Sequence, residues 1–429
     1  MSDLKKYVNE TFEIDNTVWE YACSVEKSLE SEFFAIDKIA EYNQYKVLSA
    51  MQKNKLSDTH FAATTGYGYN DLGRDTLEQV YADVFGAESA LVRPQIVSGT
   101  HALAIAMSGN LRPGDEILSP VGIPYDTLQG VIGIRKERCS LFEYGITYKQ
   151  VDLLKDGSFD YENIKKAISD KTKLVTIQRS KGYEYRKSLS IDEIKELISF
   201  IKQIDENIIC MVDNCYGEFV ETLEPSEIGA DLVVGSLIKN PGGGLAATGG
   251  YIVGKEEYVE NAAARLTAPG LGKEVGATLG MTSSFFQGLF NASQVVGGSV
   301  KGGLFLAKLF EGLNFSVLPT SSEKRADIVQ CIQLMNADNV IAFCQGIQKG
   351  APVDSYVKPE PWNMPGYDCP VIMAAGAFIQ GSSIELSADA PMKPPYNVFF
   401  QGGLSWHHAK IGILTGLQTM VDRGLIKIL

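Results

Sequence analysis

Short apolar runs alternate with longer amphipathic stretches along most of the chain up to about residue 290. A short apolar run bounded by polar or turn-forming residues is typical of a buried strand. Apolar positions three and four residues apart, as in the stretch after Ser190, are typical of a helix that buries one face. This repetition predicts an α/β fold with a mostly parallel sheet flanked by helices. The expected strands are residues 90–92, 116–118, 139–144, 173–178, 208–212 and 231–235, and the expected helices include 74–86 and one that begins at Ser98.

The pattern differs at the two ends of the chain. Residues 1–60 are charged, with apolar positions at helical spacing, and predict a helical arm that packs on another surface such as a second subunit. Residues 61–290 form the expected main α/β domain. A small-residue helical stretch, Gly288–Phe310, then predicts a buried helix. Residues 291–429 predict a smaller C-terminal α/β domain, with strands at 313–318 and 340–344.

Composition narrows the class of protein. The 429 residues are 45% hydrophobic and 21% charged, which is typical of a globular protein with more than one core. A net charge of −13 argues against a nucleic-acid-binding surface. The seven cysteines contain no C-x-x-C pair, so we expect reduced thiols and no metal site. The N-terminus lacks a signal-peptide core and no run of apolar residues is long enough to span a membrane, so we expect a cytoplasmic protein without a membrane partner.

Three reactive side chains follow two of the expected strands. Asp213 ends the strand 208–212, and the strand 231–235 leads into Ser236 and Lys239. Ligands of open α/β sheets bind at the carboxyl ends of the strands. A carboxylate, a hydroxyl and an amine suit the pyridine nitrogen, the phosphate and the aldehyde of pyridoxal 5'-phosphate (PLP). Alternatively, the lysine lies on the surface and the aspartate shapes a turn.

The chemistry of PLP explains each residue type. Lys239 would form the Schiff base and move the substrate Cα proton, for which it needs a neutral amine, favoured by desolvation and nearby positive charge. Asp213 would keep the pyridine nitrogen protonated, so that the ring accepts electrons. Ser236 would donate a hydrogen bond to the phosphate.

Further candidates lie at other strand and helix ends. Gly99 and Thr100 begin a helix whose free N–H groups suit a phosphate, although the same residues also fit ordinary helix capping. Tyr125 is placed where its ring could lie flat on a cofactor. Gln178 ends the strand 173–178, and we count it among the cofactor-binding candidates.

A polar segment rich in glycine and tyrosine, residues 64–74, precedes the first main-domain helix. It contains Tyr67, Tyr69 and Arg74, which suit a binding loop, although an ordinary loop with exposed aromatic residues fits equally well.

These motifs together resemble a known family. Ser98-Gly99-Thr100, Tyr125, Val212-Asp213-Asn214 and Ser236-x-x-Lys239 are similar to fold-type I PLP enzymes of the cystathionine/methionine γ-lyase group. Within that group, residues 69–75, 93–102 and 381–387 resemble the methionine γ-lyase-like or aluminium-resistance proteins. The resemblance implies a PLP-binding domain, a smaller C-terminal domain, and dimers that pair into homotetramers with shared sites. It also implies that Gly99, Thr100 and Ser236 hold the phosphate, that Tyr125 stacks on the ring, and that Asp213 and Lys239 act as described above.

The sequence departs from the family pattern at three points. Ile238 stands where a hydroxyl residue usually precedes the lysine, and Glu385 stands where an arginine usually binds the substrate carboxylate. The tyrosine-x-arginine pair with which a neighbouring subunit usually binds the phosphate has no match in this sequence. We expect residues of the 64–74 segment to replace that pair, with Tyr69 and Arg74 as substrate contacts. Arg179, or else Lys181, is the predicted replacement for the missing arginine.

The resulting functional hypothesis is elimination of a thiol from a sulfur-containing amino acid by a PLP-dependent carbon–sulfur lyase. Two alternatives remain open. One is an aminotransferase, since the same cofactor apparatus serves both reactions. The other is a PLP-binding stress or metal-tolerance protein with little catalysis, which the carboxylate at Glu385 keeps possible.

Overall fold

The computed structural model describes residues 2–67, 69–364 and 369–428, and the chain divides into two compact units. The larger unit is Tyr42–Ala292. The smaller unit combines the N-terminal residues up to Glu41 with the residues from Ser293 onward. The predicted N-terminal arm, residues 1–60, is therefore divided between the two units.

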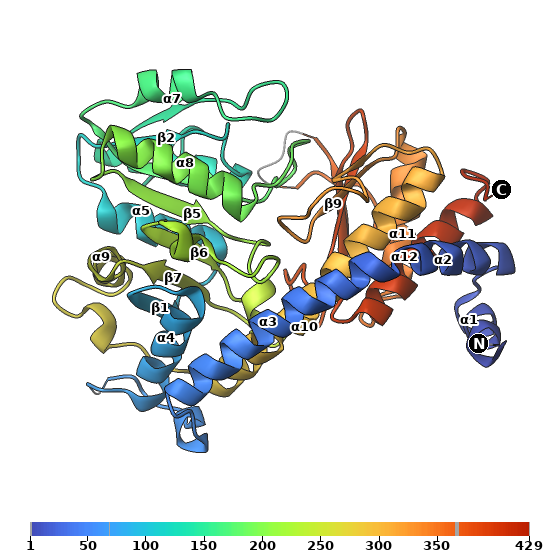
Figure 1. The fold of residues 1–429 in the computed structure, drawn as a ribbon, viewed down its shortest axis with the longest axis horizontal. Coiled ribbons are helices and arrows are strands. Elements are labelled where there is room, and N and C mark those ends of the chain that lie inside the picture. The colour runs from blue at the N-terminus through green and yellow to red at the C-terminus, as the bar shows by residue number, and fades with distance from the viewer. Residues whose placement is uncertain (1, 68, 365–368, 429) are drawn as a thin grey trace. The chain divides into compact units, whose positions relative to one another are not determined.

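The larger unit contains, in its described part, a seven-stranded sheet of order β1-β7-β6-β5-β4-β2-β3 (Figure 1). Neighbours from β6 to β3 pair in parallel, whereas β7 pairs antiparallel with both β6 and β1. The carboxyl ends of β4, β5 and β6 thus point the same way, which brings the residues that follow these strands to one edge. The strands are β1 (Ser89–Arg93), β2 (Glu116–Ser119), β3 (Thr147–Gln150), β4 (Thr172–Gln178), β5 (Ile209–Asp213), β6 (Leu232–Ser236) and β7 (Gly250–Gly254).

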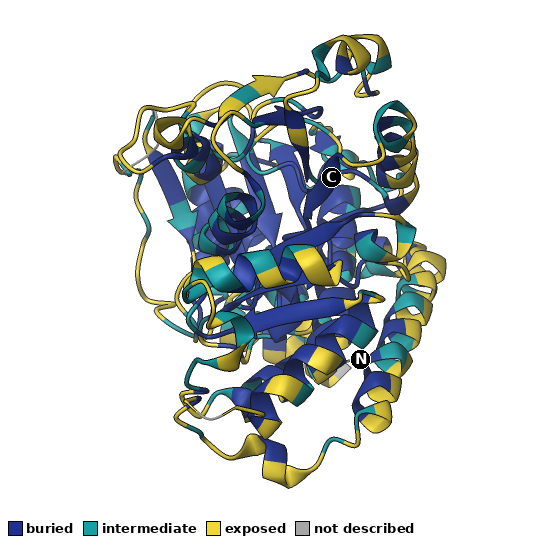
Figure 2. Ribbon diagram, turned by 90° about the vertical axis from the view of Figure 1, so that its left-hand side faces the viewer, coloured by how far each residue is buried: buried dark blue, intermediate teal, exposed yellow. Residues whose placement is uncertain are grey.

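Helices cover both faces of this sheet. On one face, α5 and α9 pack beside each other on alternate residues of the central strands, including Met211, Leu232 and Ile252. On the other face, the rings of Tyr81 and Phe85 in α4 pack against Tyr251, with centroids 6.1 and 5.0 Å away. In Figure 2 most strands are buried, whereas the edge strand β3 and the outer faces of many helices are exposed. The helices of this unit include α4 (Leu72–Phe85), α5 (Gly99–Asn110), α6 (Asp126–Ile132), α7 (Tyr161–Ala167), α8 (Ile191–Ile204) and α9 (Glu256–Leu266).

The smaller unit contains, within its described residues, a five-stranded antiparallel sheet of order β10-β11-β12-β9-β8. Helices α11 and α12 pack together, and α2 packs on α12. The Asp15 backbone N–H donates to Gln418 Oε1 at 2.8 Å, which ties the N-terminal segment to α12. The strands are β8 (Val317–Leu318), β9 (Gln330–Gln333), β10 (Val371–Ala374), β11 (Ser387–Pro391) and β12 (Asn397–Gln401), and the helices are α1 (Ser2–Phe12), α2 (Asn16–Ser28), α11 (Ala337–Lys349) and α12 (Trp406–Asp422).

The boundary between the two units falls within two long helices. These are α3 (Glu30–Lys53) and α10 (Thr282–Gly312). The second includes the buried helix expected at Gly288–Phe310. Among the described residues, no helix is long and apolar enough to cross a membrane.

The predicted fold class is confirmed: the chain is α/β, with a mostly parallel sheet flanked by helices and a smaller C-terminal α/β domain. Two expected strands are wrong. Residues 139–144 form a 3-10 turn, Leu141–Tyr144, and the edge strand follows it in the polar segment Thr147–Gln150. Residues 340–344 lie inside α11 (Ala337–Lys349), because Asn336 caps the helix and most of the apolar run is buried within it. A short apolar run alone does not distinguish a strand from a buried helix segment.

Candidate active site

A small cavity of about 50 Å³ opens at the carboxyl ends of β4, β5 and β6 in the larger unit. Gln178 ends β4, Asp213 ends β5, and Lys239 follows β6. Parallel pairing aligns Gln178 with Asp213 and Asp213 with Val234, so residues far apart in sequence meet at one edge. The cavity is lined by Tyr125, Gln178, Ser180, Gly182, Asp213, Cys215, Tyr216 and Lys239.

Asp213 is a buried carboxylate on the cavity wall. Its Oδ1 accepts a hydrogen bond from the Cys215 backbone N–H at 3.2 Å, and its backbone carbonyl accepts one from Arg179 N–H at 3.1 Å. Burial raises the pKa of Asp213, while the nearby Lys239 amine and the hydrogen bonds from Cys215 oppose that shift. A buried carboxylate in this setting suits a cationic N–H partner such as a protonated pyridine.

The Lys239 amine lies in the cavity beside an aromatic ring. Its Nζ lies 3.9 Å from the centroid of the Tyr216 ring. Burial lowers the pKa of Lys239, but Cys215, Tyr216, Asp213 and Tyr125 together raise it more, so the net shift is upward. The amine thus lies among acidic groups, which differs from the expected positive neighbour. Without a bound cofactor, Lys239 is charged at neutral pH.

The glycine-rich turn after Lys239 fixes the start of the lysine side chain. Asn240–Gly242 form a 3-10 turn, and Asn240 Nδ2 donates to the Glu218 carbonyl at 3.0 Å. A Cβ on Gly242 would lie 1.8 Å from the Leu237 carbonyl oxygen, so only glycine fits there. The close return of the chain explains why glycines follow the lysine.

The first turn of α5 lies beside Ser236. The Ser98 hydroxyl caps this helix by accepting from His101 N–H at 3.1 Å. A Cβ on Gly99 would lie 3.4 Å from both Ser236 Cβ and Cys215 Sγ, so the absence of one leaves the Gly99 backbone open toward Ser236. Within the described residues, the Ser236 hydroxyl has no hydrogen-bond partner. A helix N-terminus with an available hydroxyl beside it suits an anion such as phosphate.

Tyr125 reaches the cavity from the residue before α6. Its backbone N–H donates to Gln178 Oε1 at 2.7 Å, and Gln178 Nε2 donates to the Ser180 carbonyl at 2.9 Å. A Cβ on Gly182 would lie 3.1 Å from Tyr125 Cδ2. Gln178 therefore positions Tyr125 through its backbone, and Gly182 lets the chain pass close to the ring.

Arg179 does not reach the cavity that it was predicted to serve. Its side chain is fully buried, with Nη1 donating to Asn214 Oδ1 at 2.8 Å and Nη2 to Glu221 Oε1 at 3.1 Å. Side chains alternate along a strand, so Gln178 faces the cavity and the next residue points away. The structure therefore gives Arg179 a role in holding the chain after Asp213. Lys181, the second choice, is also fully buried.

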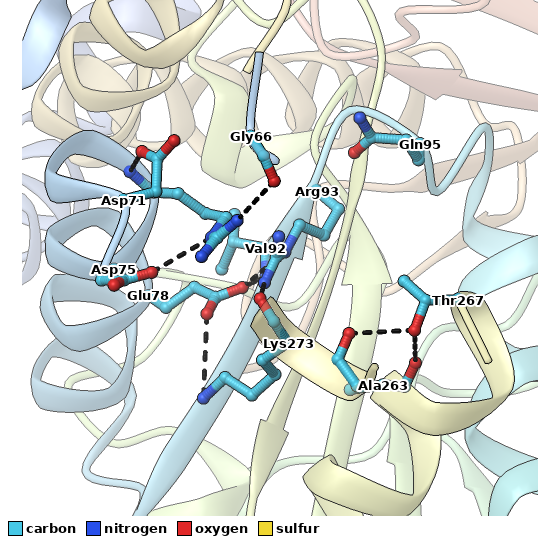
Figure 3. Close-up of polar contacts among 12 residues, drawn as sticks. Gly66, Asp71, Asp75, Glu78, Val92, Arg93, Gln95, Ala263, Thr267 and Lys273 are labelled. Atoms are coloured by element: carbon cyan, nitrogen blue, oxygen red, sulfur yellow. Dashed lines mark hydrogen bonds and ion pairs between the residues drawn. The ribbon is translucent and has the colours of Figure 1, made fainter. Parts of the chain in front are cut away.

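Arg74 is likewise bound to its own chain. Its Nη1 donates to the carbonyls of Gly66 and Glu274, each at 3.3 Å. In the same cluster, the Arg93 guanidinium donates to Glu78 and to the carbonyl of Lys273 (Figure 3). It also donates to the carbonyl of Val275.

Arg74 fixes the base of the 64–74 segment through the Gly66 carbonyl, whereas Arg93 holds the 273–275 backbone. Tyr69, by contrast, is 76% exposed, and Tyr67 is 85% exposed. The prediction of a binding loop requires accessible side chains, and of the three candidates only the two tyrosines are accessible. Arg74 instead holds the backbone of the segment. Gly68 lies outside the described residues.

The Glu385 carboxylate, in the smaller unit, is held by two backbone hydrogen bonds. Its two carboxylate oxygens accept hydrogen bonds from the backbone N–H groups of Phe378 and Ile379, each at 2.8 Å. Burial raises the pKa of Glu385, while these two hydrogen bonds oppose the shift. The carboxylate thus organises the turn at 378–379.

A second buried carboxylate, Glu218, lies behind the lysine. Its Oε1 accepts from Tyr251 O–H at 2.8 Å, and its Oε2 is buried without a partner among the described residues. Burial, as the main cause, raises the pKa of Glu218 to about 8. Glu218 is therefore mostly protonated at neutral pH.

Sequence reasoning did not find every cavity residue. It placed Tyr125, Gln178, Asp213 and Lys239 there and missed Ser180, Gly182 and Tyr216. Cys215 also lines the cavity and was not among the candidates. Their closeness to the strand ends could have identified them. Ser180, Gly182, Cys215 and Tyr216 all lie within four positions of the end of β4 or β5.

Comparison with known proteins identifies the family. The family model described as Methionine gamma-lyase matches residues 18–421. Because this match spans nearly the whole sequence, the chain belongs to the methionine gamma-lyase family. The resemblance seen in the sequence is thereby confirmed.

Several relatives match over almost their full length. Protein YnbB of Bacillus subtilis (strain 168) is 52% identical over 407 residues, covering 94% of this chain and 97% of that protein. A solved structure from Clostridium acetobutylicum is 50% identical with a TM-score of 0.95, covering 98% of this chain and 99% of the other. A carbon-sulfur lyase involved in aluminum resistance from Clostridium novyi NT is 48% identical with a TM-score of 0.94 and the same coverage. The family and these neighbours support a PLP-dependent lyase.

We predict that Arg179→Ala lowers the free energy of unfolding of the larger unit by about 3–5 kcal/mol, because it leaves Glu221 and Glu224 buried without their cation. Urea unfolding measures the change. The matched control is Arg265→Ala on the exposed side of α9, for which we expect a change within about 0.5 kcal/mol. Normal stability with lost amino-acid binding would instead restore the substrate role for Arg179.

The raised pKa of Glu218 predicts a pH-dependent stability. Between about pH 4.5 and 8 the folded chain keeps a proton on Glu218 that the unfolded chain has lost, so the stability contributed by this group falls as pH rises. The limiting slope for one group is about 1.4 kcal/mol per pH unit. We expect Glu218→Gln to remove this slope, so that the variant gains stability relative to the wild type from pH 5 to 8 in urea titrations. Glu162→Gln, at an exposed position, is the control, and parallel curves for all three proteins would contradict a protonated Glu218.

Proposed function

We propose that this protein is a PLP-dependent carbon–sulfur lyase that eliminates a thiol from a sulfur-containing amino acid. The observation that carries the proposal is the half-buried Lys239 side chain in a cavity whose wall includes the Asp213 carboxylate from the neighbouring strand. An amine and a carboxylate at adjacent parallel strand ends, beside a helix N-terminus, form the residue set that PLP requires.

The residues present fit the cofactor. Gly99, Thr100 and Ser236 would hold the phosphate, since the Ser236 hydroxyl has no partner within the described residues and Gly99 leaves room beside it. Asp213 would bind the pyridine nitrogen, and Tyr125 would lie on the ring. When bound, PLP supplies an electron sink for the pair released as a bond to the substrate Cα breaks.

The chain's own groups account for binding and proton movement. Lys239 Nζ would bind the cofactor and would later take the proton from the substrate Cα. The Asp213 carboxylate would pair with the ring nitrogen and stabilise positive charge there. Gln178 holds the Tyr125 backbone, and thereby places the ring that would cover the cofactor.

Elimination is favoured over transamination by family membership and by similarity to the Clostridium novyi carbon-sulfur lyase. Because Arg179 is buried in ion pairs, we propose that the substrate carboxylate meets residues of the 64–74 segment, with Tyr69 as the first candidate. The proposed assembly is a homodimer or homotetramer, and the proposed location is the cytoplasm.

We predict that the purified protein is yellow and that borohydride reduction fixes the cofactor covalently to Lys239. Peptide mass mapping locates the modified residue. The matched control, Lys239→Ala, should show neither the colour nor the label. A label on another lysine, or none after reconstitution with PLP, would contradict the proposal.

Product analysis separates the candidate reactions. With L-cystathionine or L-methionine as substrate, a lyase releases a thiol, ammonia and a 2-oxo acid. An aminotransferase would release a 2-oxo acid without the thiol and would require an amino acceptor. A labelled Lys239 with no product from any amino acid would favour a binding protein with little catalysis.

A site shared between subunits predicts complementation. Lys239→Ala lacks the amine but keeps the tyrosine segment, and Tyr69→Ala lacks one exposed tyrosine but keeps the amine. If Tyr69 serves a neighbouring subunit, mixed oligomers of these two inactive chains should recover about a quarter to a half of wild-type activity per oligomer, because some sites contain both intact residues. Activity is measured after co-expression, with each variant alone as control. Mixed oligomers without activity would show that Tyr69 acts elsewhere.

A further inference from the structure

The loop after β5 holds two bulky residues in an unusual backbone conformation. Tyr216 has φ 72° and Phe219 has φ 63°, in the left-handed region that favours glycine. Non-glycine residues persist there only where surrounding contacts compensate for the strain, and such positions concentrate at functional sites. Since Tyr216 also lines the cavity, its strained position places the ring where the chemistry is proposed.

Buried contacts hold this loop in place. Glu224 Oε1 accepts from the Phe219 backbone N–H at 2.8 Å, and Glu224 Oε2 accepts from Asn214 Nδ2 at 2.8 Å. A Cβ on Gly217 would lie 2.4 Å from Arg179 Cδ, so the arginine fills the space directly beside the loop. The backbone on both sides of Tyr216 is therefore fixed.

The fixed loop presses the Tyr216 ring against the lysine. Lys239 Nζ lies 3.9 Å from the ring centroid, well inside the range of a cation–π contact. The amine is buried, and such contacts are strongest where water is excluded. The ring face therefore stabilises the charged form of this amine.

We propose that Tyr216 is a catalytic residue whose ring holds the charged form of Lys239, the form that the lysine takes after receiving the substrate proton. The inference rests on the proposed function. In this step the substrate Cα–H bond breaks, the proton forms a new bond to the lone pair of Lys239 Nζ, and the electron pair of the broken bond stays with the substrate–cofactor system. The ring contact makes Lys239 a stronger base for that transfer.

Other titratable groups also face the lysine, and they are separable from the ring. Four further groups act on Lys239 or are acted on by it: Asp213, Cys215, Tyr125 and Glu218. Tyr216→Leu leaves all four in place and removes the ring. Tyr216→Phe keeps the ring and removes only the hydroxyl, so it is the matched control. Tyr216→Met is a second ring-free variant that fills similar space if the leucine variant folds poorly.

The first measurement uses the cofactor-free full-length protein. Trace acetylation of amines at neutral pH, quantified by mass spectrometry, reports the neutral fraction of Lys239, with the exposed Lys171 as internal reference. Loss of the ring should lower the pKa of Lys239 by about one unit and raise its relative labelling roughly tenfold. Tyr216→Phe should label like the wild type.

The second measurement uses the PLP-loaded protein. Exchange of the Cα proton of L-methionine in D2O, followed by NMR, reports proton transfer to and from Lys239. Exchange should slow roughly tenfold in the ring-free variants and stay near wild type in Tyr216→Phe. Faster labelling without slower exchange would mean only wider access to the cavity and would overturn the inference, as would ring-free variants that match the wild type in both measurements.

The two proposals fail in different ways. A wild-type protein that neither fixes PLP on Lys239 nor exchanges the Cα proton would refute the proposed function. A wild-type protein that does both, with ring-free variants unchanged, would refute only the role of Tyr216.

Discussion

One buried guanidinium, that of Arg179, organises the candidate site. The guanidinium binds Asn214 and Glu221 and lies near Glu224. The backbone N–H of Arg179 donates to the Asp213 carbonyl. Removing a lone charge from water is costly, so the arginine and the two carboxylates depend on one another. Burial raises the pKa of Glu224, and the charge of Arg179 opposes this. The cavity wall after β5 thus takes its shape from an ion-pair cluster that does not itself line the cavity.

Much of the fold and of the site could be predicted from the sequence. Asp213 and Lys239 were predictable because parallel strands bring their carboxyl ends together, and the pattern marks where each strand ends. Arg179 was misplaced because sequence reasoning used its position at a strand end and not the alternation of side chains. Consecutive side chains point in opposite directions, so Gln178 lines the cavity and Arg179 is buried behind it.

The remaining differences have equally physical causes. Tyr216 carries no periodic signal, and its contact with Lys239 depends on a left-handed backbone that the sequence of a loop does not reveal. Glu385 stands where the resemblance to the family predicts an arginine. Hydrogen bonds from the 378–379 backbone give its carboxylate a structural role that the sequence does not reveal. The segment 340–344 was assigned to a strand because its apolar run is short, whereas its cap and neighbours make it helical.

The close contact between Gly66 and Gly276 has a consequence for whatever meets the exposed tyrosines. A Cβ on Gly66 would lie 1.9 Å from the Gly276 carbonyl oxygen, and the Gly276 N–H donates to the Gly66 carbonyl at 3.0 Å. With Arg74 bound to the same carbonyl, the base of the segment is rigid before any encounter. When a partner surface receives Tyr67 or Tyr69, the segment therefore loses less conformational entropy than a flexible loop would. Substituting Gly66 would act on affinity through preorganisation, even though the glycine itself presents no side chain to bind.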